Sequence, residues 1–126
     1  MLGNATLTAF VATTDAARSK SFYGGTLGLP LLSEDQFALV FDCSGIQLRI
    51  QVLKQLRTQP FTVLGWQVAN VRQTVSALAK GGVALERYPY LQQDDFGVWQ
   101  APSGAKVAWF KDPDGNLLSV TEPAAA

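Results

Sequence analysis

A run of alternating apolar and polar side chains is the first candidate for chemistry in this chain. The segment IQLRIQVL predicts a β-strand that carries Gln47, Arg49 and Gln51 on one face. An arginine between two glutamines suits a carboxylate, a phosphate or a polar carbonyl group, because it offers several N–H donors in a fixed geometry. Two other interpretations stay open. The polar face is simply exposed to solvent, or Arg49 pairs with an acidic residue such as Glu122 or Asp95.

A second candidate is the acidic turn in the segment KDPDGNLLSV, residues 111–120. The order Asp112-Pro113-Asp114-Gly115 favours a β-turn, because proline presets one backbone angle and glycine accepts a conformation that a side chain resists. A cation site would need more oxygen ligands than these two carboxylates supply. We therefore interpret the turn as structural.

Histidine is absent from the chain, and Cys43 is its only cysteine. Without histidine there is no Ser-His-Asp or Cys-His arrangement and no imidazole base. Zinc, iron and copper sites built on histidine are excluded for the same reason. A single cysteine cannot form an internal disulfide, and we interpret Cys43 as a half-buried residue at a strand end.

The composition is that of one globular domain. The chain has 126 residues, 48% of them hydrophobic, and its ten basic and ten acidic residues cancel. A net charge of zero provides no attraction to nucleic acid or to an anionic membrane surface. No apolar run reaches the roughly 20 residues of a membrane span, and no segment resembles a secretion leader. The expected location is therefore the cytoplasm.

The expected elements repeat in two halves. Thr14 or Asp15 is expected to cap a first helix and Asn70 a second, and a pair of glycines ends each helix. The order strand, helix, strand, strand, strand in each half predicts an α+β fold of two tandem βαβββ modules, about residues 5–54 and 60–122, in a single domain, residues 1–126. Strands are predicted at residues 6–13, 27–32, 37–41, 46–53, 60–69, 83–87, 97–101, 106–111 and 117–121.

Two segments carry a resemblance to a known family. DAARSKSFYGGTLGLPLL is similar to the first-helix signature of the vicinal oxygen chelate superfamily, which includes glyoxalase I, bleomycin-resistance proteins and extradiol dioxygenases. VAWFKDPDGNLLSV resembles the last hairpin of that superfamily. The resemblance covers nearly the whole chain. It implies a cupped mixed sheet with helices on the convex face, and it implies a homodimer.

The resemblance also implies where a metal would bind. Metal-using members have four inward-facing ligands, which are His, Glu or Gln, on the first and last strands of the modules. Matching the motifs places these positions at Thr8, Arg49, Trp66 and Ser119. A guanidinium repels cations, an indole only donates hydrogen bonds, and hydroxyls alone bind divalent ions weakly. We therefore expect no metal and no other cofactor.

Aromatic side chains complete the expected site. If the sheet curves as in the superfamily, the polar face of the alternating strand lines the cup. Trp66 and Trp109 are expected there too, although a tryptophan on a strand more often belongs to the core. The side on which Trp99 lies is not predicted. The polar loop LQQDDFG, a candidate lid, is flanked by three aromatic residues: Tyr88, Tyr90 and Phe96.

These expectations describe a metal-independent protein that sequesters an aromatic or anionic small molecule in the cup and has no catalytic residue. A first alternative is an enzyme without a metal, in which Asp94, Asp95 or Glu34 acts as the base. Arg49 would then stabilise a developing anion. A second alternative is a non-catalytic accessory subunit that presents an apolar patch to a protein partner. The expected ligand-binding residues are Thr8, Gln47, Arg49, Gln51, Trp66, Trp109 and Ser119.

Overall fold

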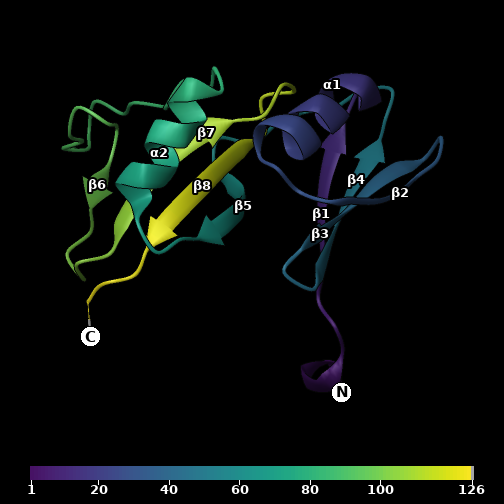
Figure 1. The fold of residues 1–126 in the computed structure, drawn as a ribbon, viewed down its shortest axis with the longest axis horizontal. Coiled ribbons are helices and arrows are strands. Elements are labelled where there is room, and N and C mark those ends of the chain that lie inside the picture. The colour runs from purple at the N-terminus through teal and green to yellow at the C-terminus, as the bar shows by residue number, and fades with distance from the viewer. Residues whose placement is uncertain (126) are drawn as a thin grey trace. The chain divides into compact units, whose positions relative to one another are not determined.

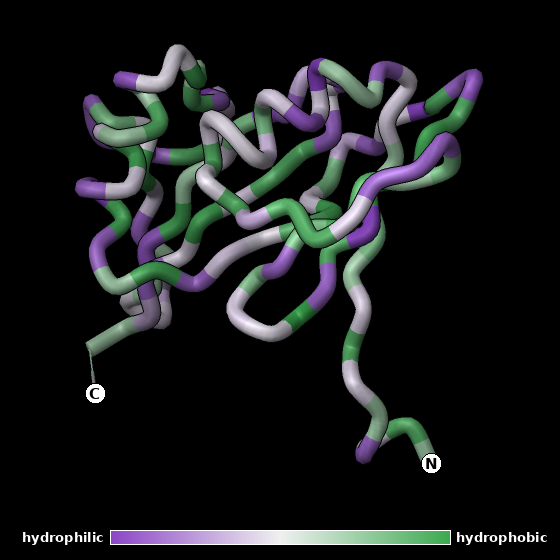
Figure 2. Tube along the Cα trace, turned by 45° about the vertical axis from the view of Figure 1, so that its right-hand side comes forward, coloured by the Kyte–Doolittle hydropathy of each residue, from purple (hydrophilic) through white to green (hydrophobic). Residues whose placement is uncertain are grey.

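The computed structural model describes residues 1–125 of the chain. They form two compact units, Met1–Arg57 and Thr58–Ala126, each built around its own β-sheet (Figure 1). The boundary between the units falls between the two predicted modules. Hydrophobic and hydrophilic residues alternate over short distances in both units (Figure 2). No helix among residues 1–125 is long and apolar enough to cross a membrane.

Unit 1, Met1–Arg57, is a four-stranded mixed sheet with one helical layer. The strands lie in the order β1-β4-β3-β2. Strand β1 is parallel to β4, and the other neighbours are antiparallel. The N-terminal turn η1 extends away from this sheet (Figure 1). In chain order the elements are η1 (Leu2–Asn4), β1 (Thr8–Thr13), α1 (Ala16–Lys20), η2 (Ser21–Thr26), β2 (Leu31–Glu34), β3 (Ala38–Cys43) and β4 (Ile46–Val52).

The helical segment of unit 1 begins where the sequence predicts. Asp15 Oδ1 accepts a hydrogen bond from Arg18 N at 3.1 Å, which caps the first turn of α1. The chain then widens into the π-helical turn η2. This turn directs Tyr23 inward. The Tyr23 ring is fully buried, and its centroid lies 6.2 Å from the centroid of the Phe41 ring on β3. The helices therefore cover the face of the sheet that carries Phe41.

Unit 2, Thr58–Ala126, repeats this arrangement with shorter edge pairing. Its strands lie in the order β5-β8-β7-β6, with β5 parallel to β8. The predicted α+β class with two tandem modules is confirmed, with the strands divided into two separate four-stranded sheets. The elements of this unit are β5 (Thr62–Gln67), α2 (Val71–Lys80), β6 (Trp99–Gln100), β7 (Lys106–Lys111) and β8 (Leu117–Glu122).

Helix α2 is fixed to its sheet at the N-terminus. Asn70 Oδ1 accepts a hydrogen bond from Gln73 N at 3.1 Å, as the predicted cap requires. Glu122 Oε1, at the end of β8, accepts a hydrogen bond from Val71 N at 3.0 Å. The helix therefore lies on the face of β8 to which Glu122 points. Its apolar stripe is buried against that face through Val71, Val75 and Leu78.

The strand predicted after α2, at residues 83–87, is wrong. Only Leu85 pairs there, in an isolated bridge with Phe110. The segment leads into a loop. Backbone groups of this loop form hydrogen bonds with the side chain of Gln93 in place of a second strand ladder. Gln93 Oε1 accepts a hydrogen bond from Tyr88 N at 2.7 Å. The β-branched and apolar residues that suggested a strand therefore precede a loop held by local side-chain contacts.

The acidic turn between β7 and β8 is structural, as predicted. Asp112 is 5% exposed, and its Oδ1 accepts hydrogen bonds from Asp114 N at 3.0 Å and from Asn116 N at 2.9 Å. Its Oδ2 accepts another from Asn116 Nδ2 at 2.8 Å. Gly115 has a φ of 93°, the left-handed conformation that favours glycine. The carboxylate is thus used to close the hairpin.

Candidate functional site

Strand β4 separates a helix-covered face from an open face in unit 1. Leu48 pairs with Phe41 in the β3–β4 ladder, and both Leu48 and Ile50 are fully buried on the helix side. Because side chains alternate along a strand, the intervening polar residues lie on the open face. The predicted alternation is therefore confirmed for Gln47, Arg49 and Gln51.

The register of the neighbouring strands shows what surrounds these polar residues. Thr8 of β1 pairs with Gln47, so Thr8 lies on the same open face. Phe10 of β1 and Val40 of β3 are the partners of Arg49 on its two sides. Phe10 is 53% exposed. The sequence analysis missed Phe10, although its position two residues after Thr8 in a predicted strand was a sufficient signal.

Arg49 is half-buried, and none of the ion pairs found among residues 1–125 involves it. The two acidic residues considered as its partners are engaged or exposed elsewhere. Glu122 binds the backbone of α2 and lies 3.6 Å from Lys106 Nζ. Asp95 is exposed in the unit 2 loop, where its carbonyl oxygen accepts a hydrogen bond from Arg87.

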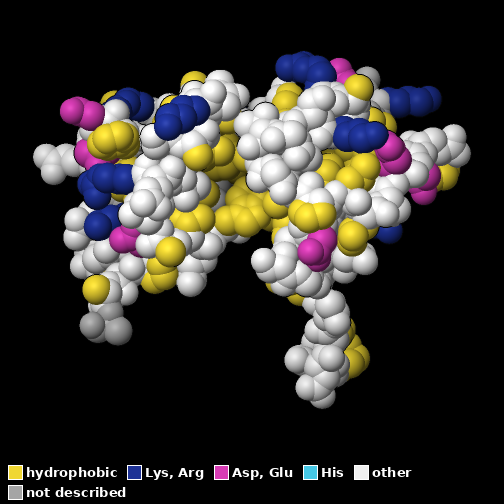
Figure 3. Space-filling view, in the orientation of Figure 1, with side chains coloured by type: hydrophobic (Ala, Val, Ile, Leu, Met, Phe, Trp, Pro, Cys, Tyr) yellow, Lys and Arg dark blue, Asp and Glu magenta, His cyan; other side chains and the backbone are white. Residues whose placement is uncertain are grey.

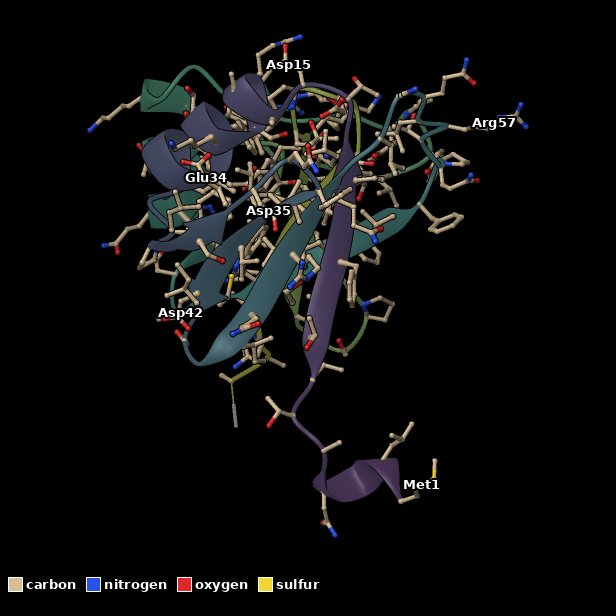
Figure 4. All side chains as sticks on the ribbon, turned by 90° about the vertical axis from the view of Figure 1, so that its right-hand side faces the viewer. Met1, Asp15, Glu34, Asp35, Asp42 and Arg57 are labelled. Carbon is tan, nitrogen blue, oxygen red and sulfur yellow. The ribbon has the colours of Figure 1, made fainter. Side chains whose placement is uncertain are left out.

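Asp35, which the sequence analysis did not single out, is a carboxylate whose pKa Arg49 influences. Its Oδ1 accepts hydrogen bonds from Phe37 N at 2.8 Å and from Ala38 N at 3.0 Å. These two bonds lower the pKa of Asp35, and the Arg49 guanidinium lowers it further. Figure 4 shows Asp35 and Asp42 near opposite ends of β3. Asp35 is therefore ionised at neutral pH and adds a negative charge near the guanidinium.

The open face of unit 2 brings together two of the predicted residues. Trp109 of β7 and Ser119 of β8 are direct partners in the ladder, so they share one face. Gly65 of β5 pairs with Ser119 from the other side. A Cβ atom at Gly65 would lie 2.6 Å from Ser119 Oγ, which means that the serine side chain occupies the space above the glycine. Ser119 is 8% exposed.

The structure separates Trp66 from Trp109 and Ser119. Trp66 pairs with Val120 of β8, and Val120 points to the same side as Glu122, which contacts α2. Trp66 therefore lies on the helix-covered face. Matching the family motifs to the sequence had placed the open-face position at Trp66, the residue after Gly65. The ladder shows that Gly65 itself occupies that position, and a shift of one residue moves a side chain to the other side of the sheet.

An aromatic cluster lies on the open face of unit 2. The indole rings of Trp99 and Trp109 have centroids 6.1 Å apart and are tilted by 33°. The ring of Tyr88 stands at 86° to Trp109, with centroids 5.5 Å apart. The ring centroids of Tyr90 and Tyr88 are 5.6 Å apart. The two indoles form a floor and Tyr88 forms a wall, a combination that depends on the path of the loop and was not predicted.

The loop that carries Tyr88 is held in place by two polar side chains. Gln93 bonds Tyr88 N and donates from Nε2 to Glu86 O at 2.9 Å and to Gly97 O at 2.8 Å. Asp94 Oδ1 accepts hydrogen bonds from two backbone amides of the same loop. Its Oδ2 accepts from Arg72 Nη2 of α2 at 2.7 Å. The loop considered as a lid is therefore anchored to itself and to the helix.

A comparison with models of protein families identifies the family to which the chain belongs. The model of the Glyoxalase/Bleomycin resistance protein/Dioxygenase superfamily matches residues 6–120. The chain belongs to this superfamily. The match spans both units and confirms the resemblance drawn from the two sequence motifs. A comparison with curated protein sequences finds no match.

Solved structures of low sequence identity share the superfamily fold. A glyoxalase family protein from Bacillus anthracis is 16% identical, with a TM-score of 0.75 over 95% of each chain. A lactoylglutathione lyase from Agrobacterium tumefaciens is also 16% identical, with a TM-score of 0.74 over 94% of this chain and 93% of its own. A glyoxalase family protein from Enterococcus faecalis is 23% identical, with a TM-score of 0.68 over 93% and 94% of the two chains.

The residues of this superfamily member do not fit a divalent metal. Thr8 and Ser119 supply hydroxyls, Arg49 supplies a cation, and Trp66 faces the helix. Among residues 1–125, no three His, Cys, Asp or Glu side chains come close enough together to hold a metal ion. Divalent cations require several carboxylate, carbonyl or imidazole ligands, and this donor set contains none of them.

Two of the three carboxylates considered as a catalytic base, Asp94 and Glu34, are engaged in structural contacts, whereas Asp95 is exposed. Burial raises the pKa of Asp94, but hydrogen bonds from Val98 N, Arg72 and Phe96 N outweigh it, and the pKa is lowered. Glu34 pairs with Lys20 at 2.6 Å on the surface. A carboxylate whose pKa is lowered is a weak base. These contacts do not favour Asp94 or Glu34 as a general base.

Proposed function

We propose that this protein binds a small organic molecule without a metal ion, and that an aromatic part of the ligand rests on the Trp99–Trp109 floor. The observation that carries this proposal is the pair of half-buried indoles on a face of the sheet that α2 does not cover. Flat aromatic side chains with a few polar groups at their edge are typical of small-molecule sites. Ser119, beside Trp109 in the ladder, borders the floor on the same face.

Tyr88 limits the shape of the ligand. Its ring stands almost perpendicular to Trp109, so a flat molecule on the floor would meet the Tyr88 ring with its edge. Burial raises the pKa of the Tyr88 hydroxyl, and the Glu86 carboxylate adds to the effect. The hydroxyl is therefore protonated at neutral pH and can donate a hydrogen bond. This geometry favours a planar ligand with an acceptor at its edge.

Titration with the uncharged fluorescent probe N-phenyl-1-naphthylamine tests the aromatic site. Trp109→Leu removes the centre of the floor, and Trp66→Leu removes an indole from the opposite face as a matched control. We expect Trp109→Leu to weaken probe binding about tenfold, the effect of losing one aromatic stacking contact with its buried area. Trp66→Leu should bind the probe as the parent does. Far-ultraviolet circular dichroism of both variants confirms that they fold.

The proposal fails if the two variants weaken the probe equally, or if neither does. An equal loss would mean that the probe reports general stability, and no loss would place it on another surface. Probe turnover, or a new product in the mixture, would favour the metal-free enzyme instead. Binding only of a protein partner would favour the accessory-subunit alternative.

We also propose that the protein acts in the cytoplasm as a homodimer. The lone Cys43 is consistent with a reducing compartment. All four residues of the edge strand β2 are exposed, which leaves backbone groups free for pairing with another chain. Charged side chains are scattered over the visible face (Figure 3), which does not favour a nucleic acid as the partner. The intact mass in a near-neutral volatile buffer, compared with the denatured mass, distinguishes a monomer from a dimer.

A further inference from the structure

We propose that the open face of unit 1 binds the carboxylate group of a small organic acid at Arg49. The site consists of Arg49, Gln47 and Gln51 on β4, Phe10 on β1 and the nearby carboxylate of Asp35. It goes beyond the aromatic floor and does not rest on it, since all of its residues belong to Met1–Arg57. Either site can therefore be present without the other.

The donors on β4 are arranged in a row. Arg49 lies between Gln47 and Gln51 on one face of the strand, so neighbouring members of the row are about 7 Å apart along it. A guanidinium can bind both oxygens of a carboxylate through two parallel N–H donors. The side-chain amides of the glutamines, one on each side, can donate to the same oxygens. No ion pair among residues 1–125 involves Arg49. Its guanidinium can therefore bind a ligand without first breaking an ion pair within the protein.

The residues beside Arg49 select an organic acid over an inorganic anion. Phe10, which pairs with Arg49 in the ladder, exposes 53% of its surface, and Val40 borders Arg49 on the other strand. An anion bound at the guanidinium therefore has an apolar ring next to it. A ligand with an aryl or alkyl body gains from covering Phe10, whereas phosphate or acetate gains little.

Asp35 is a carboxylate whose charge interacts with that of Arg49. Its carboxylate is ionised and acts on Arg49, but its Oδ1 is occupied by two backbone amides of the β2–β3 turn. It therefore offsets part of the positive charge without binding the guanidinium within ion-pair distance. A bound carboxylate experiences repulsion from Asp35, so removing that charge should strengthen binding.

Nuclear magnetic resonance titration of the full chain tests the site. Sodium benzoate, sodium acetate and sodium phosphate are added separately at constant ionic strength, with sodium chloride as the baseline. We expect benzoate to shift the Arg49 Nε–H signal and the backbone amides of Phe10 and Gln47–Gln51. Arg49→Gln should weaken benzoate binding about tenfold, the usual effect of losing hydrogen bonds to a charged group. Arg57→Gln is the matched control, because Arg57 belongs to the same unit and projects away from the sheet (Figure 4).

Two further variants separate this site from general attraction of anions. Phe10→Ala should weaken benzoate about threefold and leave acetate unchanged, since only benzoate covers the ring. Asp35→Asn keeps the Oδ1 acceptor and removes the charge, so it should tighten benzoate binding about twofold. The dispersion of the amide spectrum shows whether each variant is folded.

Several outcomes would overturn the proposal. These are benzoate shifts no larger than those of chloride, equal losses in Arg49→Gln and Arg57→Gln, or benzoate shifts confined to Trp99 and Trp109. The last outcome would support the aromatic floor while excluding the unit 1 site. Conversely, shifts confined to unit 1 would support the Arg49 site and count against the floor as an aromatic-binding surface.

Discussion

Ser119 Oγ lies above Gly65, in the space that a side chain at residue 65 would fill. A Cβ at Gly65 would be 2.6 Å from that oxygen and 3.4 Å from the Ser119 carbonyl oxygen. The two residues are partners in the parallel β5–β8 ladder, so neither can move away without disturbing the hydrogen bonds of the sheet. This close approach explains why a residue without a side chain stands in the middle of a strand.

Gly65→Ala should destabilise the protein by about 1–3 kcal/mol, the usual cost of inserting a methyl group into a filled space. Urea unfolding followed by circular dichroism measures the loss. In the double variant with Ser119→Ala, part of the loss should be recovered, because the closest atom is gone. Gly25→Ala is the control, since a Cβ there has no neighbour within 4 Å. Purely additive losses in the double variant would contradict the steric explanation.

Gln93→Ala should loosen the loop that positions Tyr88. The change removes three hydrogen bonds, to Tyr88 N, Glu86 O and Gly97 O, and should cost about 1–3 kcal/mol of stability. The near-ultraviolet circular dichroism of the aromatic cluster should decrease with it. The adjacent and exposed Gln92 provides the control, Gln92→Ala, for which we expect no change in either signal. An unchanged aromatic signal in Gln93→Ala would show that Tyr88 is held by its ring contacts alone.

Asp94→Asn should reduce stability at neutral pH but not in acid. The pKa of Asp94 is lowered in the folded protein. Its negative charge therefore stabilises the fold at every pH above 3.8, the ordinary pKa of an aspartate. That contribution disappears as the pH falls through the folded pKa. We expect a loss of about 0.5–1 kcal/mol at pH 7, because the pair with Arg72 is partly exposed. Urea midpoints at pH 7 and in strong acid measure the difference, with the exposed neighbour Asp95→Asn as the control.

The β3–β4 and β7–β8 hairpins each have an aspartate at the turn, Asp42 and Asp112, and should respond differently to its loss. The carboxylate of Asp112 is buried and accepts hydrogen bonds from two backbone amides and one side-chain amide of its own turn. The carboxylate of Asp42 accepts one, from Gly45 N at 2.9 Å. Asp112→Ala leaves the buried Asn116 amide without this acceptor and should cost about 2–4 kcal/mol. Asp42→Ala should cost about 1 kcal/mol or less. Equal losses of unfolding free energy would show that burial does not determine the contribution of these aspartates.

The sequence was sufficient for the parts of the fold that depend on local pattern. The cap at Asn70 and the alternation around Arg49 were predicted correctly, and the first cap was narrowed to Thr14 or Asp15, because each depends on neighbours within a few residues. The side of Trp66 was not, because the period of two in a strand makes an error of one residue a complete inversion.

The remaining site residues depend on contacts between distant segments. Tyr88 meets Trp109 because the loop before β6 returns to the sheet, and no local pattern specifies that path. The charge of Asp35 influences Arg49 from the turn between β2 and β3, which the local sequence pattern does not reveal either. The sequence showed that aromatic and acidic residues were present, but it did not show which of them meet.

In each unit the first strand pairs with the last, β1 with β4 and β5 with β8, so every ladder is completed within its own half of the chain. A substitution on one open face therefore leaves the hydrogen-bond pattern of the other half untouched. The two proposed binding faces can therefore be altered separately. One carries indoles and the other a guanidinium, on the same arrangement of strands.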